Sequence, residues 1–210
     1  MNLHTHALRL ATAGKPVRVG LIGAGKFGSM FLSQVPTTPG LIVTTIADLD
    51  PDRARAACAN VGWDQHRIAA TRFIDSGEAL CARADVDVVI EATGHPGAGI
   101  RHALSAFQNG KHIVMVNVEA DVLAGAALAR RADEAGVVYT MAYGDQPALV
   151  SEQVEWARAS GFKVVCAGKG TKYLPEYHHV TPEGVWGHYG LTPEEAKAAG
   201  MNPQMFNSFL

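Results

Sequence analysis

Cysteine and excess positive charge are the two features that this sequence most clearly lacks. Three cysteines occur in 210 residues, at Cys58, Cys81 and Cys166, and no two of them form a C-x-x-C pair. A disulfide framework is therefore not expected, and we expect three small buried residues in a protein kept in a reducing compartment. Lysine and arginine total 18 against 20 aspartates and glutamates. The chain thus has no basic excess for binding the phosphates of a nucleic-acid partner.

Long apolar runs are also missing. No stretch approaches the ~18 consecutive apolar residues that mark a membrane-spanning helix. Residues 1–16 contain scattered His and Arg instead of a signal-peptide core. We therefore expect a soluble protein of the cytoplasm with no membrane partner. The composition is otherwise ordinary, and 48% hydrophobic residues are sufficient for a substantial core.

One stretch near the N-terminus, Val17 to Phe31, has the sequence VRVGLIGAGKFGSMF. Its first residues are apolar and β-branched and predict a buried strand, and the apolar residues after the glycines recur at helical spacing. Gly23, Gly25 and Gly28 thus form a G-x-G-x-x-G turn between a strand and a helix, a typical site for a dinucleotide pyrophosphate. The first glycine permits the turn, the second lets backbone N–H groups approach the phosphates, and the third lets the helix pack closely on the strand.

A carboxylate follows the next apolar run, 41–47, where the adenosine ribose of a dinucleotide would lie. Asp48 stands twenty positions after Gly28 and would accept hydrogen bonds from both ribose hydroxyls, which favours NAD. Arg53 follows on the next predicted helix and could neutralise the 2′-phosphate of NADP, so NADP or NAD are both retained as cofactors. The predicted cofactor-binding residues of this part of the chain are Gly23, Gly25, Lys26, Phe27, Gly28, Asp48 and Arg53.

Strand and helix patterns alternate from residue 17 to residue 160. Apolar runs predict strands at 17–22, 41–47, 67–73, 86–90, 112–116 and 137–142, with a further strand at 163–167. Helical periodicity separates them, most clearly at 97–108. This alternation is typical of the α/β class, and we expect a Rossmann-type doubly wound parallel sheet over residues 1–160.

The loop after the strand at 86–90 should border the same crevice, because the carboxyl ends of parallel strands meet at one edge of the sheet. Thr93, Gly94 and His95 occupy this loop. Thr93 and Gly94 are predicted to contact the cofactor. The neutral imidazole of His95 either moves a proton near the nicotinamide or only lines the pocket.

Two further polar side chains follow the strand at 112–116 and should lie at the same edge of the sheet. Asn117 and Glu119 have no evident structural task, since Asp121 is expected to cap the following helix. We therefore predict that Asn117 and Glu119 contact the nicotinamide or the substrate, with simple loop positions as the alternative.

The alternation stops after residue 160, and residues 161–210 are interpreted as the beginning of a substrate domain. Lys169 and Lys172 lie among glycines in GKGTKY, where a lysine can hold an anion or give a proton to a developing alkoxide. We predict these two lysines, together with His95, as the catalytic residues. The later histidines do not have the spacing of a structural zinc site, so no metal is expected. The chain ends on apolar residues, from which we expect this domain to be truncated.

Three segments, VRVGLIGAGKFG, VDVVIEATGHPG and VNVEADVLAG, make the chain resemble the homoserine dehydrogenase family of NAD(P)-dependent oxidoreductases. The segments VNVEADVL, GKGTKYLPEYH and GMNPQMFNSFL resemble a bacterial branch described as 1-deoxy-D-xylulose 5-phosphate reductoisomerase-like, or SAF-domain-containing. Homoserine dehydrogenases carry a lysine after the asparagine that matches Asn117. This chain has Val118 there, which argues against homoserine itself as the substrate.

The resemblance implies an NAD(P)-dependent oxidoreductase that transfers a hydride between the nicotinamide and a small hydroxylated, anionic substrate. One reaction of this kind that the resemblance implies is a reductoisomerase-like reaction on a pentulose phosphate. The resemblance also implies a longer protein, for which we expect a homo-oligomer. Two alternatives are a homoserine dehydrogenase and a non-catalytic dinucleotide-binding sensor or inactive truncated product.

Overall fold

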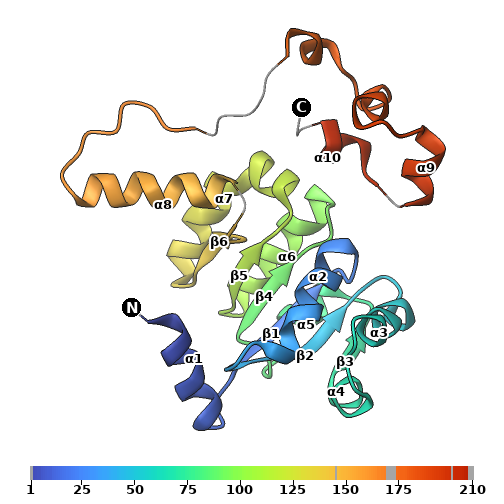
Figure 1. Ribbon diagram of the computed structural model, residues 1–210. Helices are drawn as coiled ribbons and strands as arrows, with labels where there is room; N and C mark the ends of the chain where they lie inside the picture. The colour runs from blue at the N-terminus through green and yellow to red at the C-terminus, as the bar shows by residue number, and fades with distance from the viewer. Residues whose placement is uncertain (1, 145, 169–173, 200, 208–210) are drawn as a thin grey trace. The chain divides into compact units, whose positions relative to one another are not determined.

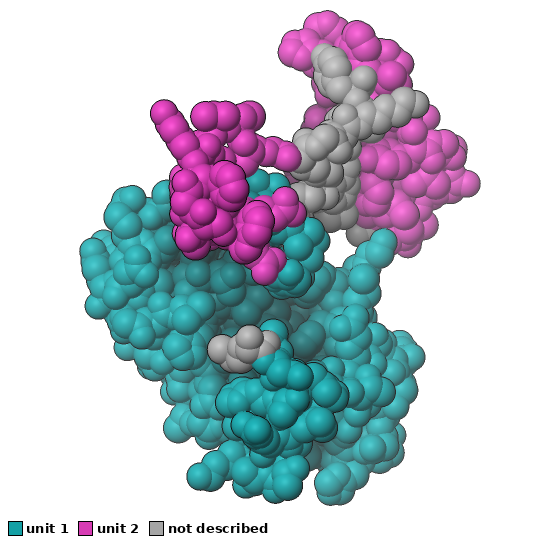
Figure 2. Space-filling model, turned by 60° about the vertical axis from the view of Figure 1, so that its left-hand side comes forward, with its two compact units in different colours: residues 1–151 teal, residues 152–210 magenta. Residues whose placement is uncertain are grey.

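The structure is a computed structural model that describes residues 2–144, 146–168, 174–199 and 201–207. Its contacts divide the chain into two compact units, residues 1–151 and 152–210, which Figure 2 colours separately. The division falls inside the helix α8 (Gln146–Ala159), whereas the sequence places it at the end of that helix. This division is one of contacts and does not test the domain boundary at residue 160, which stays a prediction.

A six-stranded sheet lies at the centre of the first unit (Figure 1). Its strands are β1 (Val17–Ile22), β2 (Leu41–Ala47), β3 (Arg72–Ile74), β4 (Val88–Glu91), β5 (His112–Met115) and β6 (Tyr139–Met141). All five neighbouring pairs are parallel, and the strand order is β3-β2-β1-β4-β5-β6. This is the order of a Rossmann fold, so the predicted doubly wound sheet is confirmed. The order reverses between β1 and β4, which is the point where such sheets bind their ligands.

Helices cover both faces of the sheet, and each face has its own hydrophobic core. The helices of this unit are α1 (Leu3–Thr12), α2 (Lys26–Gln34), η1 (Val35–Thr37), α3 (Pro51–Asn60), α4 (Gln65–Ala70), α5 (Gly77–Cys81), α6 (Pro96–Gln108), α7 (Val118–Ala135) and the start of α8. Consecutive residues of β1 belong to different cores: Leu21 packs with Leu32 of α2, and Ile22 packs with Leu80 of α5. Burial on both faces explains why these strands are nearly continuous apolar runs.

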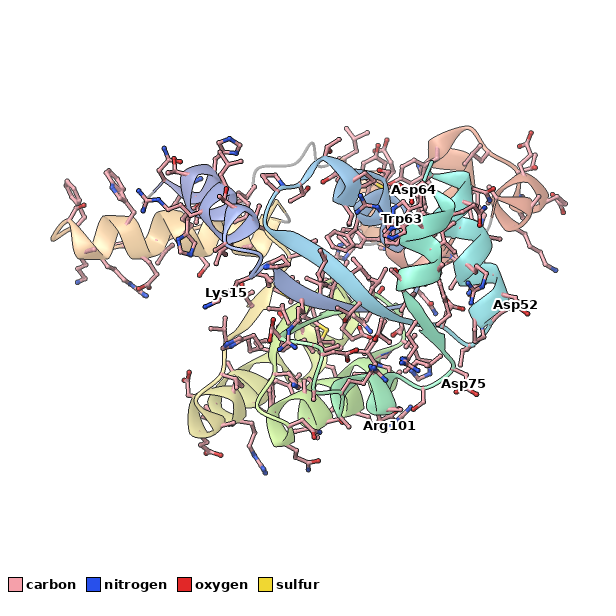
Figure 3. The ribbon with its side chains drawn as sticks, turned by 90° about the horizontal axis from the view of Figure 1, so that it is seen from below. Lys15, Asp52, Trp63, Asp64, Asp75 and Arg101 are labelled. Atoms are coloured by element: carbon pink, nitrogen blue, oxygen red, sulfur yellow. The ribbon has the colours of Figure 1, made fainter. Side chains whose placement is uncertain are left out.

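The short helix α4 occupies most of the segment predicted as a strand at 67–73. Asp64 caps it by accepting a hydrogen bond of 2.7 Å from the backbone N–H of Arg67, and Figure 3 shows Asp64 beside Trp63 at the start of this helix. Ile68, a residue of this helix, is only 5% exposed, so the helix buries one apolar side chain of the run. Residues 72 and 73 of the predicted strand do lie in β3, so the prediction was wrong only for residues 67–71. A short apolar run fits a helix and a strand equally well.

Residues 162–168 form neither a helix nor a strand, although the sequence predicts a strand at 163–167. Val165 is 87% exposed, so its apolar side chain is not buried on a sheet as a strand residue would be. Cys166 in the same segment is also exposed, contrary to the expectation for the cysteines. Cys58 and Cys81 are buried as predicted, and burial raises the pKa of their thiols to about 11 and about 12. Both are therefore unreactive neutral thiols.

The second unit contains short elements after the end of α8. They are η2 (Pro175–His179), η3 (Val185–Tyr189), α9 (Pro193–Ala198) and α10 (Pro203–Asn207). A small hydrophobic core joins η3 to α9 through Val185, Trp186 and Ala196. The helices of the described ranges include none with the length and apolar content needed to cross a membrane.

Candidate cofactor site

The glycine-rich turn connects β1 to α2 at the point where the strand order reverses. Gly23 has a φ of +94°, and a Cβ at this position would lie 2.7 Å from the carbonyl oxygen of Ala92, which follows β4. A Cβ at Gly28 would overlap the carbonyl oxygen of Gly23. The first and third glycines are therefore required by the fold itself, because backbone atoms occupy the space of a side chain.

Gly25 differs from its two neighbours in the motif. It is the N-cap of α2, no side chain caps this helix end, and the position of its missing Cβ has no atom within 4 Å. The first N–H groups of a helix lack partners within the helix, and they favour an anion. The turn thus leaves open the space in which a pyrophosphate would meet these N–H groups, and Lys26 and Phe27 are exposed on the first turn.

Asp48 lies next to this turn, with its side chain only 4% exposed. Its carboxylate accepts hydrogen bonds from the backbone N–H groups of Ala24 at 2.9 Å and Asp50 at 3.0 Å, and from the Arg53 guanidinium at 2.6 Å. Burial opposes ionisation, but these hydrogen bonds together hold the pKa of Asp48 below its ordinary value. The residue predicted to bind ribose therefore also braces the glycine turn.

Arg53 lies at the rim of the same site. Its side chain is 62% exposed, although its guanidinium contacts the buried Asp48. The other arginine of this helix, Arg55, instead lies over the ring of Phe73, 4.3 Å from its centroid. Of the two arginines, Arg53 is therefore the one that pairs with Asp48.

Acid should destabilise the fold partly through Asp48. The pKa of this carboxyl is lowered in the folded chain and returns to about 3.9 on unfolding. Its stabilising contribution is therefore complete above pH ~4 and disappears as the pH falls through the folded pKa. In urea unfolding near neutral pH, wild type should be more stable than Asp48→Asn, and the difference should shrink below pH ~4. A difference that does not change with pH would contradict this assignment.

The loop after β4 is organised by its own side chains. The Thr93 hydroxyl donates a hydrogen bond of 2.6 Å to Glu91, and Gly94 is exposed with a φ of +68°. His95 is the N-cap of α6, since its Nδ1 accepts a hydrogen bond of 3.2 Å from the N–H of Ala98. In this arrangement a proton-moving role for His95 falls to its Nε2.

Asn117 has a structural task that the sequence did not indicate. It is the N-cap of α7, where its Oδ1 accepts from the Ala120 N–H at 3.1 Å, and its Nδ2 donates to the carbonyl of His95 at 3.0 Å. Asp121, which was expected to be the cap, instead accepts a hydrogen bond of 2.6 Å from the Tyr139 hydroxyl. The capping prediction was wrong because the N-cap of the helix is Asn117 and the helix begins at Val118, four residues earlier than a cap at Asp121 implies.

Three predicted residues remain, Glu119, Lys169 and Lys172, of which the structure describes only Glu119. Glu119 lies half-buried in the first turn of α7. Lys169 and Lys172 lie outside the described residues, so their catalytic roles stay predictions. Within the described ranges, no group of three or more His, Cys, Asp or Glu side chains could hold a metal ion.

Two buried ionisable residues of this region were not predicted. Glu91, the last residue of β4, is 0% exposed, and His102 of α6 is 6% exposed. The His102 Nδ1 lies 3.1 Å from the Glu91 Oε1. The available signal was a carboxylate that ends the apolar run VVIE, since burial of such a group requires a partner.

This geometry defines a Rossmann-type dinucleotide-binding domain. The chain belongs to the oxidoreductase family with an NAD-binding Rossmann fold (GFO_IDH_MocA), whose model matches residues 17–143. Residues 144–210 match the model of the catalytic domain of oxidoreductase DRL. The chain therefore combines an NAD-binding domain with a segment that matches an oxidoreductase catalytic-domain model.

Curated relatives match about half of the chain. Homoserine dehydrogenase of Neisseria gonorrhoeae (strain ATCC 700825 / FA 1090) is 31% identical over 112 residues, which cover 49% of this chain and 23% of that protein. A glycosyl hydrolase family 109 protein of Streptomyces niveus is 36% identical over 99 residues, which cover 46% of this chain and 20% of that protein. The matches thus span about a quarter or less of each relative's length.

Solved structures share the fold. The WlbA dehydrogenase from Bordetella pertussis, in complex with NADH and UDP-GlcNAcA, matches with a TM-score of 0.52 and 24% identity over 70% of this chain and 40% of that one. A homoserine dehydrogenase from Thiobacillus denitrificans matches with a TM-score of 0.52 and 22% identity over 60% of this chain and 29% of that one.

Proposed function

We propose that this chain binds NAD(P) through residues 17–143 and belongs to an enzyme that transfers a hydride between the nicotinamide and a small hydroxylated, anionic substrate. The cofactor supplies the hydride chemistry, while the protein orients the reactants and stabilises charge. The family membership and the dehydrogenase relatives support this proposal. The observation that carries it is the glycine turn at the point where the strand order reverses. Backbone atoms occupy the Cβ positions of the first and third glycines, whereas the Cβ position of the middle one, Gly25, faces open space.

The site also suggests how the two cofactors are distinguished. The Asp48 carboxylate suits the ribose hydroxyls of NAD, and the exposed Arg53 suits the 2′-phosphate of NADP. Because Arg53 pairs with Asp48 in the described structure, binding of either cofactor would involve a rearrangement of this pair. We propose that the chain accepts both cofactors, with the orientation of Arg53 setting the preference.

The substrate is proposed from the second part of the chain. Residues 144–210 match an oxidoreductase catalytic domain, and they contain Lys169 and Lys172, which we propose as groups that hold the substrate anion or supply its proton. The reductoisomerase-like reaction on a pentulose phosphate, the homo-oligomeric state and the cytoplasmic location are parts of this proposal that rest on the sequence. His95 is the third proposed catalytic residue.

Replacing Gly25 by valine tests the cofactor site directly. The new Cβ would have no atom within 4 Å, it would lie in the open space beside the uncapped helix end, and the φ of −73° suits a residue with a side chain. The dissociation constant for NADH, measured by fluorescence titration, should rise by about tenfold or more, equivalent to losing one hydrogen bond to a charged group. The thermal midpoint should change little.

Gly187→Val is the matched control, because Gly187 also has no atom within 4 Å of its Cβ position and lies in η3 of the second unit. It should leave the affinity for NADH unchanged. Tight NADH binding by Gly25→Val would overturn the site assignment. Wild-type binding without oxidation of NADH in the presence of pentulose phosphate or homoserine would favour a sensor or a different substrate.

A further inference from the structure

We propose that Glu91 and His102 form a buried positioning pair that sets the loop facing the nicotinamide. This inference rests on the proposed NAD(P) site and adds to it two residues that do not themselves touch the cofactor. The pair lies beneath the carboxyl end of β4, next to the point where the strand order reverses.

Glu91 is placed where a carboxylate is costly. Its side chain is 0% exposed, and its Oε2 has no hydrogen-bond partner among the described residues. Its Oε1 accepts from the Thr93 hydroxyl at 2.6 Å and lies 3.1 Å from the His102 Nδ1. Leaving one oxygen of a buried carboxyl group without a partner costs stability. Stability alone therefore gives a weak reason for this carboxylate.

The contacts of Glu91 lead directly to the proposed cofactor edge. Thr93 is exposed, so its hydroxyl links the buried carboxylate to the surface of the site. Asn117 lies 3.4 Å from the same hydroxyl through its Nδ2 and also donates to the His95 carbonyl. The loops after β4 and β5 are thus joined through one network whose buried end is Glu91.

His102 is held rigidly at the other end of the network. A Cβ at Gly77, at the start of α5, would overlap the His102 ring, so the ring packs against bare backbone. Its Nε2 lies 3.6 Å from Glu78, whose other oxygen lies 3.5 Å from Arg101, which is labelled on α6 in Figure 3. A fixed imidazole orients the Glu91 carboxylate and thereby the Thr93 hydroxyl.

The test compares NADH with ADP-ribose, which lacks the nicotinamide. In Glu91→Leu the dissociation constant for NADH should rise about tenfold, because the Thr93 hydroxyl is no longer held in place and its hydrogen bond to the nicotinamide end of the cofactor is lost. That for ADP-ribose should change less than about twofold, because its binding surfaces are the glycine turn and Asp48. Glu91→Gln retains an acceptor for Thr93 and should restore most of the NADH affinity. Glu134→Leu, at an exposed position of α7, is the control and should change neither ligand.

Thr93→Val provides the test if Glu91→Leu does not fold. Thr93 is exposed, and the substitution only replaces its hydroxyl by a methyl group. It should weaken NADH binding selectively, and Thr93→Ser should restore it. Equal weakening of NADH and ADP-ribose, or a lowered thermal midpoint with unchanged NADH affinity, would overturn the positioning role alone. Failure of the wild-type chain to bind either ligand would overturn the proposed function together with this inference.

Discussion

Replacing Gly23 by alanine is expected to lower the free energy of unfolding by about 3 kcal/mol and to abolish NAD(P)H binding. The φ of +94° is unfavourable for any residue with a Cβ, and that Cβ would also stand 2.7 Å from the Ala92 carbonyl oxygen. To relieve the contact, β1 and the loop after β4 must separate. This separation opens the sheet at the point where the cofactor would bind.

Gly62→Ala separates these two causes. Gly62 has a similar φ of +86°, but no atom lies within 4 Å of its Cβ position. Its replacement should cost about 1 kcal/mol from the backbone conformation alone and leave NADH binding intact. Urea unfolding and fluorescence titration of the two variants provide the comparison. Equal losses of stability in both would show that the close approach of Ala92 has no energetic effect.

Opposite shifts of cofactor preference are expected from Arg53→Ala and Asp48→Asn. Removing the Arg53 guanidinium takes away the proposed partner of the 2′-phosphate, so the ratio of the NADPH to the NADH dissociation constant should rise about tenfold. Removing the Asp48 charge relieves its repulsion of that phosphate, and the ratio should fall by about tenfold. The two variants should thus differ by about 100-fold in this ratio.

Arg55→Ala is the matched control for the arginine. Arg55 lies on the same helix but is stacked on Phe73, so its loss should not alter the ratio. The measurement is the titration of each variant with NADH and NADPH at one fixed ionic strength, because phosphate contacts are screened by salt. A ratio that moves in the same direction in Arg53→Ala and Asp48→Asn would contradict the proposed role of the pair.

The glycine turn with its flanking strand and helix was predictable because its signals are local. The glycines of the turn, the strand before them and the helix after them are adjacent in the chain, and the position of Asp48 follows from the known spacing of the motif. The structure confirms the doubly wound fold and places Gly25 and Asp48 at the switch point. It adds that Asp48 supports the turn through the Ala24 N–H, which spacing alone does not indicate.

The parts that were missed depend on contacts between distant segments. The strand prediction at 163–167 failed because a strand requires a neighbour, and an apolar run does not reveal whether one exists. The task of Asn117 was missed because the start of α7 could not be located within a few residues from periodicity. His102 is eleven residues from Glu91 in the chain, and only the packing of α6 on β4 brings them together.

The sequence by itself determined the class of the fold and the kind of cofactor. The apolar periodicity of strands and helices and the need for glycine in a tight turn depend on residues that are close in the chain. They can therefore be recognised without knowledge of the packing. The tertiary structure decided which polar side chains brace the site and which are free to face a ligand. Those roles depend on burial and on hydrogen bonds between strand ends, as in the link from Glu91 through Thr93 to Asn117.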